Sequence, residues 1–184
     1  MTATASDTHS RDKQSAALSS IFASTALTLA KAAAAIFTGS LGLLSEAIHG
    51  LLDVGATVMT YFAVRIADLP ADEEHHYGHA KVESVAALAE TGLLFVASGW
   101  IIWEAIQRIL GHGGEVEVGF VAIGVVVTSI VVDFYRARHL QKVAEATGSQ
   151  ALEADALHFS SDMWSSAVVL VGLGLVLRGT VLAG

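Results

Sequence analysis

The sequence predicts an all-α membrane protein, a bundle of five transmembrane helices. Hydrophobic residues make up 53% of the 184 residues and charged residues only 15%, whereas soluble domains average about 25% charged residues. The apolar residues gather into five stretches, and each reaches the roughly 20 residues that a helix needs to cross a bilayer. The single proline, Pro70, lies between the second and third stretches, so it interrupts none of them.

The N-terminal part divides into a polar segment and two predicted spans. Residues 1–15 are polar and rich in serine and threonine, and they lack the apolar core of a signal peptide. We expect them to form a mobile cytoplasmic tail, followed by a membrane domain over residues 16–184. The first span is predicted over 16–38 and the second over 41–66, joined by a turn at Gly39 and Ser40.

Three further spans follow. A polar loop over 68–81 leads to the third span, 82–110, and a glycine-rich external turn at 111–114 leads to the fourth, 118–144. The charged last turns of the fourth span are expected to project into the cytoplasm. Residues 147–149 separate it from the fifth span, 151–177. The sequence contains no cysteine, which excludes disulfides and thiolate metal sites.

Lysine and arginine predict the orientation, because they accumulate in the cytoplasmic loops of membrane proteins. With the N-terminus inside, only Arg108 and Arg178 fall on the outer side. Seven basic residues fall on the cytoplasmic side: Arg11, Lys13, Arg65, Lys81, Arg136, Arg138 and Lys142. Lys31 lies within the first span, where it either pairs with Glu46 across the turn or extends to the outer surface. We therefore expect a multi-pass protein of a bacterial cell membrane.

Two histidine–aspartate pairs stand inside the apolar stretches, His49 with Asp53 and His158 with Asp162. Each pair is spaced i, i+4, which places both side chains on one face of a helix. Ionisable residues inside a membrane are costly and mark functional sites. Two imidazoles and two carboxylates would complete the tetrahedral ligand shell of a divalent metal such as zinc. The alternative is that the pairs only join helices through hydrogen bonds.

The predicted depth of the two pairs favours the metal site. His49 lies ten residues beyond Gly39, and His158 lies ten residues beyond Gly148, which is about 15 Å in each case. The hydrocarbon core is about 30 Å thick. Both pairs, approached from opposite faces of the membrane, are therefore predicted near its midplane.

Three segments resemble those of the cation diffusion facilitator family, antiporters that exchange a divalent metal for protons. They are residues 38–53, which end in HGLLD, residues 70–83, which include HHYGHAKVE, and residues 148–162, which end in HFSSD. The resemblance implies that His49, Asp53, His158 and Asp162 form the transport site, that zinc is favoured, and that the protein is a homodimer. The family usually has six transmembrane helices, often followed by a cytoplasmic metal-binding domain. We therefore expect the membrane domain to be C-terminally incomplete, and unstable or inactive alone.

The loop between the second and third spans carries a second candidate site, formed by Asp72, His75 and His79. The resemblance favours a metal site at the cytoplasmic mouth. The alternative is a solvated acidic loop whose histidines only shape the start of the next helix. Glu83 and Glu90, near the inner end of the third span, either line a wet vestibule or make structural hydrogen bonds.

These features favour transport over catalysis. Four protein ligands close a metal site, whereas catalytic zinc keeps a position for water, and the sequence offers no separate nucleophile. Imidazole binds a metal only after losing its proton, and histidine as a residue type titrates near neutral pH, so metal and protons compete. The alternatives are a membrane metalloenzyme and a metal-binding module that moves no ions. Nitrogen and oxygen ligands suit Zn²⁺ but also admit Fe²⁺, Co²⁺, Mn²⁺ and Cd²⁺. The hydropathy argues against nucleic-acid binding.

Overall fold

The computed structural model describes residues 5–73, 75–107, 110 and 120–183, and the regular elements of these residues are helical. They are α1 (Ala5–Thr38), α2 (Leu41–Ala67), α3 (Lys81–Gln107), α4 (Phe120–Thr147) and α5 (Gln150–Ala183). The sequence predicts five helices in nearly these places, so the all-α class is confirmed. The predicted turn at 111–114 lies outside the described residues.

Three of the described helices are long and apolar enough to cross a membrane. These candidate spans are Thr8–Thr38, Gly42–Ala67 and Lys81–Trp103, in α1, α2 and α3. Their outer faces carry large apolar side chains: Phe37 is 89% exposed and Phe95 is 77% exposed. Large exposed apolar surfaces mark contact with a membrane or a partner. That α4 and α5 also cross the membrane stays a prediction.

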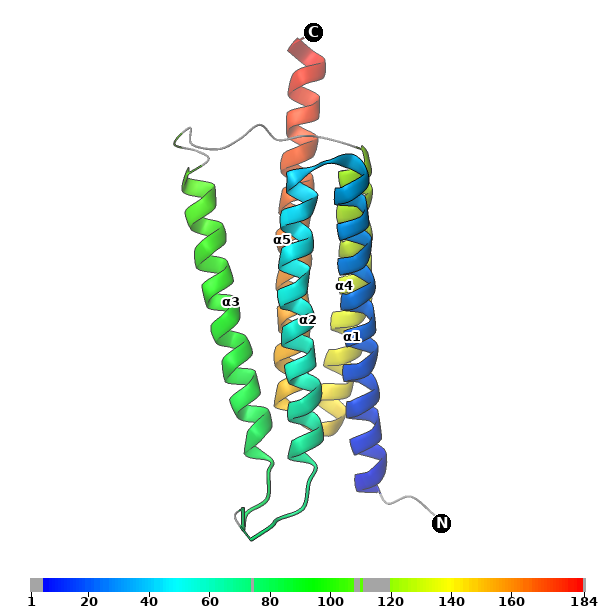
Figure 1. Ribbon diagram of the computed structural model, residues 1–184, viewed down its shortest axis with the longest axis vertical. Coiled ribbons are helices and arrows are strands. Elements are labelled where there is room, and N and C mark those ends of the chain that lie inside the picture. Colours follow the sequence, from blue (N-terminus) through cyan, green and yellow to red (C-terminus); the bar gives the residue numbers. More distant parts are fainter. Residues whose placement is uncertain (1–4, 74, 108–109, 111–119, 184) are drawn as a thin grey trace.

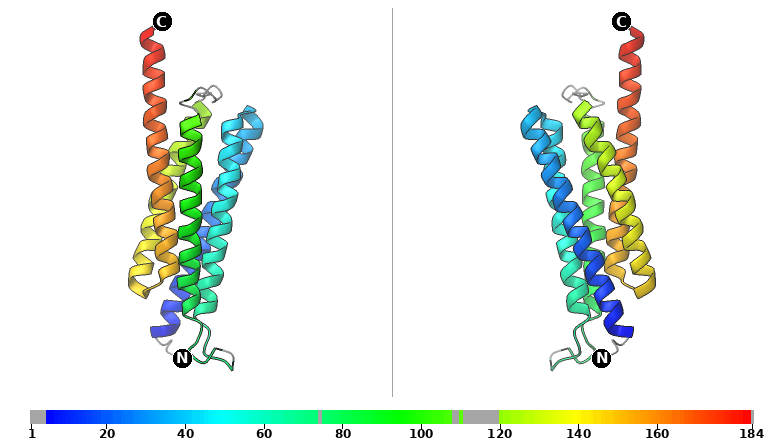
Figure 2. Two further views of the ribbon diagram at one scale, coloured as in Figure 1. Left: turned by 90° about the vertical axis from the view of Figure 1, so that its left-hand side faces the viewer. Right: turned by 90° about the vertical axis from the view of Figure 1, so that its right-hand side faces the viewer.

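The helices form one elongated bundle (Figure 1). α1 packs mainly on α2 and also on α4, whereas α5 contacts α4, α3 and α2. α3 stands at the side of the bundle and is inclined to its neighbours (Figure 1). We call the end that holds the start of α1, the α2–α3 loop and the α4–α5 turn the lower end. At the opposite, upper end, the last turns of α5 extend beyond the other helices (Figures 1 and 2).

Two tight turns fix the antiparallel pairs α1–α2 and α4–α5. Gly39 and Gly148 adopt φ values of 68° and 67°, the left-handed conformation that glycine tolerates and that commonly ends helices. A serine follows each glycine and caps the next helix. Ser40 Oγ accepts a hydrogen bond from the backbone of Leu43 at 3.5 Å, and Ser149 caps α5 in the same way. These turns set the register of the helices, which places the two His–Asp pairs at the same height in the bundle.

The buried core lies at the lower end of the bundle and consists largely of alanine. Small side chains let the helices approach closely, as is common in membrane bundles. Larger side chains fill the space between them. The core comprises Ala16, Ala17, Ala63, Val64, Ala86, Leu140, Ala144, Ala151, Leu152, Ala156 and Phe159.

The start of α1 differs from the prediction of a mobile tail over residues 1–15. The chain is helical from Ala5 onward, and Lys13 is buried. The Lys13 ammonium contacts Asp68 at the C-cap of α2 and lies 3.0 Å from the Glu83 carboxylate on α3. These ion pairs, together with the burial of Ala16, offset the entropy cost of ordering this polar segment.

Other charged side chains follow the predicted alternatives. Lys31 pairs with Glu46 across the upper turn at 3.0 Å, which confirms that prediction. Glu83 and Glu90 are buried and hydrogen-bonded, so they fit the structural alternative rather than a wet vestibule. The Ser149 hydroxyl donates to Glu83 at 2.6 Å.

Candidate metal centre

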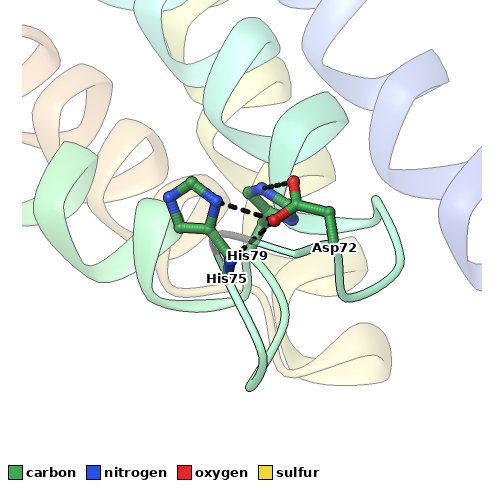
Figure 3. Close-up of side chains that lie close together, drawn as sticks. All are labelled: Asp72, His75 and His79. Atoms are coloured by element: carbon green, nitrogen blue, oxygen red, sulfur yellow. Dashed lines mark hydrogen bonds and ion pairs between the residues drawn. The ribbon is translucent and has the colours of Figure 1, made fainter.

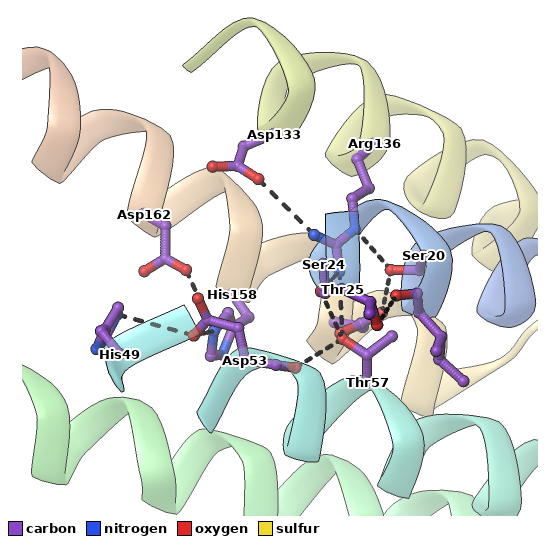
Figure 4. A network of polar contacts seen from close by, with 12 residues as sticks. Ser20, Ser24, Thr25, His49, Asp53, Thr57, Asp133, Arg136, His158 and Asp162 are labelled. Carbon is purple, nitrogen blue, oxygen red and sulfur yellow. Dashed lines mark hydrogen bonds and ion pairs between the residues drawn. The ribbon is translucent and has the colours of Figure 1, made fainter. Parts of the chain in front are cut away.

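The two His–Asp pairs come together between α2 and α5 (Figure 4). His158 Nε2 lies 3.3 Å from Asp53 Oδ1 and 3.2 Å from Asp162 Oδ2. His49 Nε2 lies 3.8 Å from Asp53 Oδ1. His49, Asp53 and Asp162 each offer a ligand atom, and these three atoms lie within 4.8 Å of one another. All four residues predicted from the sequence are therefore neighbours.

The directions of the two helices explain this arrangement. α2 descends from the upper turn, whereas α5 rises from the lower turn (Figure 1). The histidine of each pair therefore faces the aspartate of the other, as the contact between His158 and Asp53 illustrates. The i, i+4 spacing keeps both members of a pair on the face that α2 and α5 share.

The burial of the four side chains is graded. The His158 side chain is 8% exposed, those of Asp53 and Asp162 are 15% and 23% exposed, and that of His49 is 37% exposed. The centre is thus closed around His158 and more open at His49. Two nitrogen and two oxygen donors are a donor set that zinc takes, at about 2.0–2.2 Å.

The second predicted cluster also comes together, in the α2–α3 loop (Figure 3). His75 Nδ1 lies 3.1 Å from Asp72 Oδ1, and His79 Nε2 lies 3.3 Å from Asp72 Oδ2. Asp72 also accepts a hydrogen bond from the backbone N–H of His75, at 2.6 Å. The centroids of the two histidine rings are 4.5 Å apart. Asp72 therefore both shapes the loop and holds the imidazoles together, which suits either predicted role of the cluster.

A polar network beside the centre is not predicted from the sequence. Arg136 is expected to project into the cytoplasm, but it is only 7% exposed and points into the bundle (Figure 4). Its guanidinium lies 3.3 Å from the centroid of the Phe159 ring and donates to Thr57 Oγ1 at 3.2 Å. Thr57 in turn donates to the backbone carbonyl of Asp53 at 2.8 Å. Arg136 is thereby linked to the helix that carries two candidate ligands.

The sequence contains a signal for this network. Asp133 and Arg136 stand i, i+3 within the fourth apolar stretch, and their charged atoms lie 3.8 Å apart. Polar side chains of α1 complete the arginine's partners, because Arg136 also hydrogen-bonds Ser20 and Ser24. Several donors and acceptors from different helices make an interior arginine tolerable, and that tertiary arrangement is not visible in a linear pattern.

Comparison with known proteins covers most of the chain. Residues 17–182 match the family described as the cation efflux transmembrane domain. The cation-efflux pump FieF of Salmonella typhi is 34% identical over 172 residues, which cover 91% of this chain and 55% of that relative. The FieF pump of Salmonella newport (strain SL254) is 33% identical over the same length and is covered to 56%.

The chain thus spans about half the length of the curated relatives it matches. The matched family region nevertheless includes nearly all of the described helices, α4 and α5 among them. The chain is therefore a multi-pass membrane protein that belongs to the cation efflux family, a family of transporters and not of enzymes.

Proposed function

We propose that this chain forms the membrane part of a divalent-metal exporter, with zinc as the cargo and protons as the counter-ion. The observation that carries the proposal is the meeting of His49, Asp53, His158 and Asp162 between α2 and α5. This donor set suits zinc, and Fe²⁺, Co²⁺, Mn²⁺ and Cd²⁺ are alternative cargoes.

The proton coupling follows from the ligands themselves. An imidazole nitrogen binds either a proton or a metal, so each metal that enters displaces protons from the site. On the outward side, protons that return to the histidines favour release of the metal. In this scheme metal enters from the lower end, which the excess of lysine and arginine marks as cytoplasmic.

The rival function is a metal-binding module that moves no ions, and flux separates the two. Zn²⁺ uptake by the purified protein into proteoliposomes with an acidic lumen would support export, and it would contradict the expectation that residues 1–184 are inactive alone. Asp53→Asn should abolish this uptake. Asp12→Asn, at an exposed carboxylate near the start of α1, is the matched control. Zinc binding without flux in the unmodified protein would favour the rival. Uptake assays with the other four ions would rank the possible cargoes.

We propose a second, weaker metal site at Asp72, His75 and His79, which passes ions to the first. Replacing all three should lower zinc flux at low zinc concentration, while the candidate metal centre between α2 and α5 still binds zinc. His139→Ala, at an exposed histidine of α4, is the control. Unchanged flux in the triple variant would leave the loop a purely structural role.

We also propose a homodimer, as the family resemblance implies. Crosslinking in native membranes would capture it as a species of twice the monomer mass, and a chain that stays monomeric under these conditions would contradict it.

A further inference from the structure

Two buried carboxyl groups, from Glu90 on α3 and Asp155 on α5, lie beside the candidate metal centre without contributing a ligand to it. Both side chains are fully buried, at 0% exposure. The two carboxyl groups are close neighbours, where α3 packs against α5. We propose that Glu90 and Asp155 form a proton-binding site in which the two carboxyl groups share one proton. The link from this proton to metal transport rests on the proposed function; the proton itself does not.

The hydrogen bonds of the pair leave room for one proton. The Thr60 hydroxyl donates to Glu90 Oε2 at 3.3 Å, and the Ser20 hydroxyl donates to Asp155 Oδ2 at 3.2 Å. Glu90 Oε1 and Asp155 Oδ1 are buried, and within the described part of the chain no N–H or hydroxyl group donates to them. Buried carboxyl oxygens rarely lack a donor. A protonated carboxyl is itself a donor, so one shared proton joins the two groups.

The positive charge of Arg136, on α4, does not remove the need for this proton. Arg136 reaches Asp155 through Ser20, because its Nε donates to Ser20 Oγ at 2.7 Å. Arg136 also lies 3.8 Å from Asp133. The arginine thus stands beside Asp133 as well as the Glu90–Asp155 pair, and its single charge cannot balance all of these carboxylates. Two ionised carboxylates in contact away from water repel each other strongly, and one shared proton removes that repulsion.

Within the described part of the chain, the other charged neighbour of the pair is His158, on α5. Its Nε2 is already held by the two aspartates of the metal centre. The partners that α1 and α2 supply, Ser20 and Thr60, are uncharged. The proton therefore belongs to the carboxyl pair and is separate from any proton on the metal-binding histidines.

The position of the pair suggests how the proton is used. Asp155 precedes His158 by three residues, about 4.5 Å along α5 toward the lower end. A divalent cation that enters the centre repels a proton held one turn away in an interior of low dielectric. Zinc binding then ionises the pair: the carboxyl O–H bond breaks, the electron pair stays on the carboxylate, and the proton passes to water.

Infrared difference spectroscopy of the purified chain tests the proton directly. The carbonyl band of a protonated carboxylic acid should be present before zinc is added and should disappear on zinc binding. Glu90→Gln and Asp155→Asn should each remove this change, whereas Glu46→Gln at the Lys31 ion pair should keep it. ¹³C-carboxyl labelling of aspartate or glutamate should shift the band in the unmodified chain, which assigns it even if a variant fails to fold. An unshifted band, or the same band in both variants, would overturn the proposal.

Calorimetry separates this proposal from the proposed function. Zinc titrations in two buffers of different ionisation enthalpy give the protons released per ion, and Glu90→Gln should release about one fewer than the unmodified chain. An equal number would overturn the coupling of this proton to the metal. If the chain binds no zinc at all, the proposed function fails, and a pH titration of the infrared band without metal still decides whether the carboxyl pair holds a proton.

Discussion

His158 is the most buried of the four candidate ligands, and its Nε2 faces both aspartates of the centre. His49 is more open. Among the ion pairs of the described residues, its one partner is Asp53, at 3.8 Å. The two histidines therefore contribute unequally, although the sequence presents them in identical motifs. Burial explains this difference between the histidines. Where a buried ligand is removed, water does not reach the metal to take its place.

We predict that His158→Ala weakens zinc binding more than His49→Ala does. Each change removes one ligand, which should cost more than the about 10–100-fold typical of losing an outer-shell partner. Each should also reduce the number of protons released per zinc, and the remaining binding should weaken as the pH falls. Titration calorimetry in two buffers measures both quantities. His139→Ala serves as the control, and unchanged proton release in both site variants would rule out ligand-coupled exchange.

The sequence predicts the candidate ligands because their spacing alone aligns them on a helix face. The neighbouring charges are different: the spacing of Asp133 and Arg136 is visible within the fourth apolar stretch, but the packing of Arg136 onto Phe159 is not. Asp155 stands three residues before His158, and its contact with Glu90 depends on how α3 packs against α5. Spacing within a helix is thus predictable, whereas partners from other helices are not.

At the scale of the elements, α1 and α2 come into close contact where Gly50 faces Thr28. A Cβ atom at residue 50 would lie 2.5 Å from Thr28 Oγ1 and 3.3 Å from Thr28 Cβ. A side chain at this position therefore forces the helices apart or the threonine aside. Small residues at helix contacts are a general feature of membrane bundles.

We predict that Gly50→Val destabilises the bundle by about 1–3 kcal/mol, the usual cost of overpacking. Gly50→Ala should destabilise the bundle less. Adding Thr28→Ala to the Gly50→Ala variant should restore its stability, because this second change removes the threonine hydroxyl. Thermal unfolding in detergent, followed by helical circular dichroism, measures these effects. Gly55→Ala is the matched control, since a Cβ there meets nothing within 4 Å. Equal stability of the Gly50 and Gly55 variants would contradict the close contact.

Helix limits were more predictable at the turns than at the free end of α1. Gly39 and Gly148 mark their turns in the sequence, and the structure has its left-handed residues there. Residues 5–15 carry no apolar periodicity, so their helix is not visible locally. The helix forms there because Lys13 pairs with Asp68 and Glu83, which are 55 and 70 residues away in the chain.

At the scale of the whole molecule, Lys13 ties the lower end together. Its ammonium joins α1 to the end of α2 and to α3, and Glu83 extends the link to Ser149 at the start of α5. We predict that Lys13→Met destabilises the protein by about 3–5 kcal/mol, because it leaves the buried Glu83 carboxylate without a positive charge beside it. Lys142→Met, at an exposed lysine of α4, should change stability by no more than about 0.5 kcal/mol. Similar melting temperatures for both variants would show that the ion pairs contribute little.

The orientation of the molecule is testable because the sequence has no cysteine, so single cysteines can be introduced freely. Tyr77 is fully exposed in the lower α2–α3 loop, and Thr38 is exposed at the upper end of α1. If the lower end is cytoplasmic, Thr38→Cys should react with a membrane-impermeant maleimide in intact cells, whereas Tyr77→Cys should react only after permeabilisation. The physical reason is the excess of lysine and arginine at the lower end, which resists translocation. The unmodified chain provides the background, and the reverse labelling pattern would invert the proposed direction of metal export.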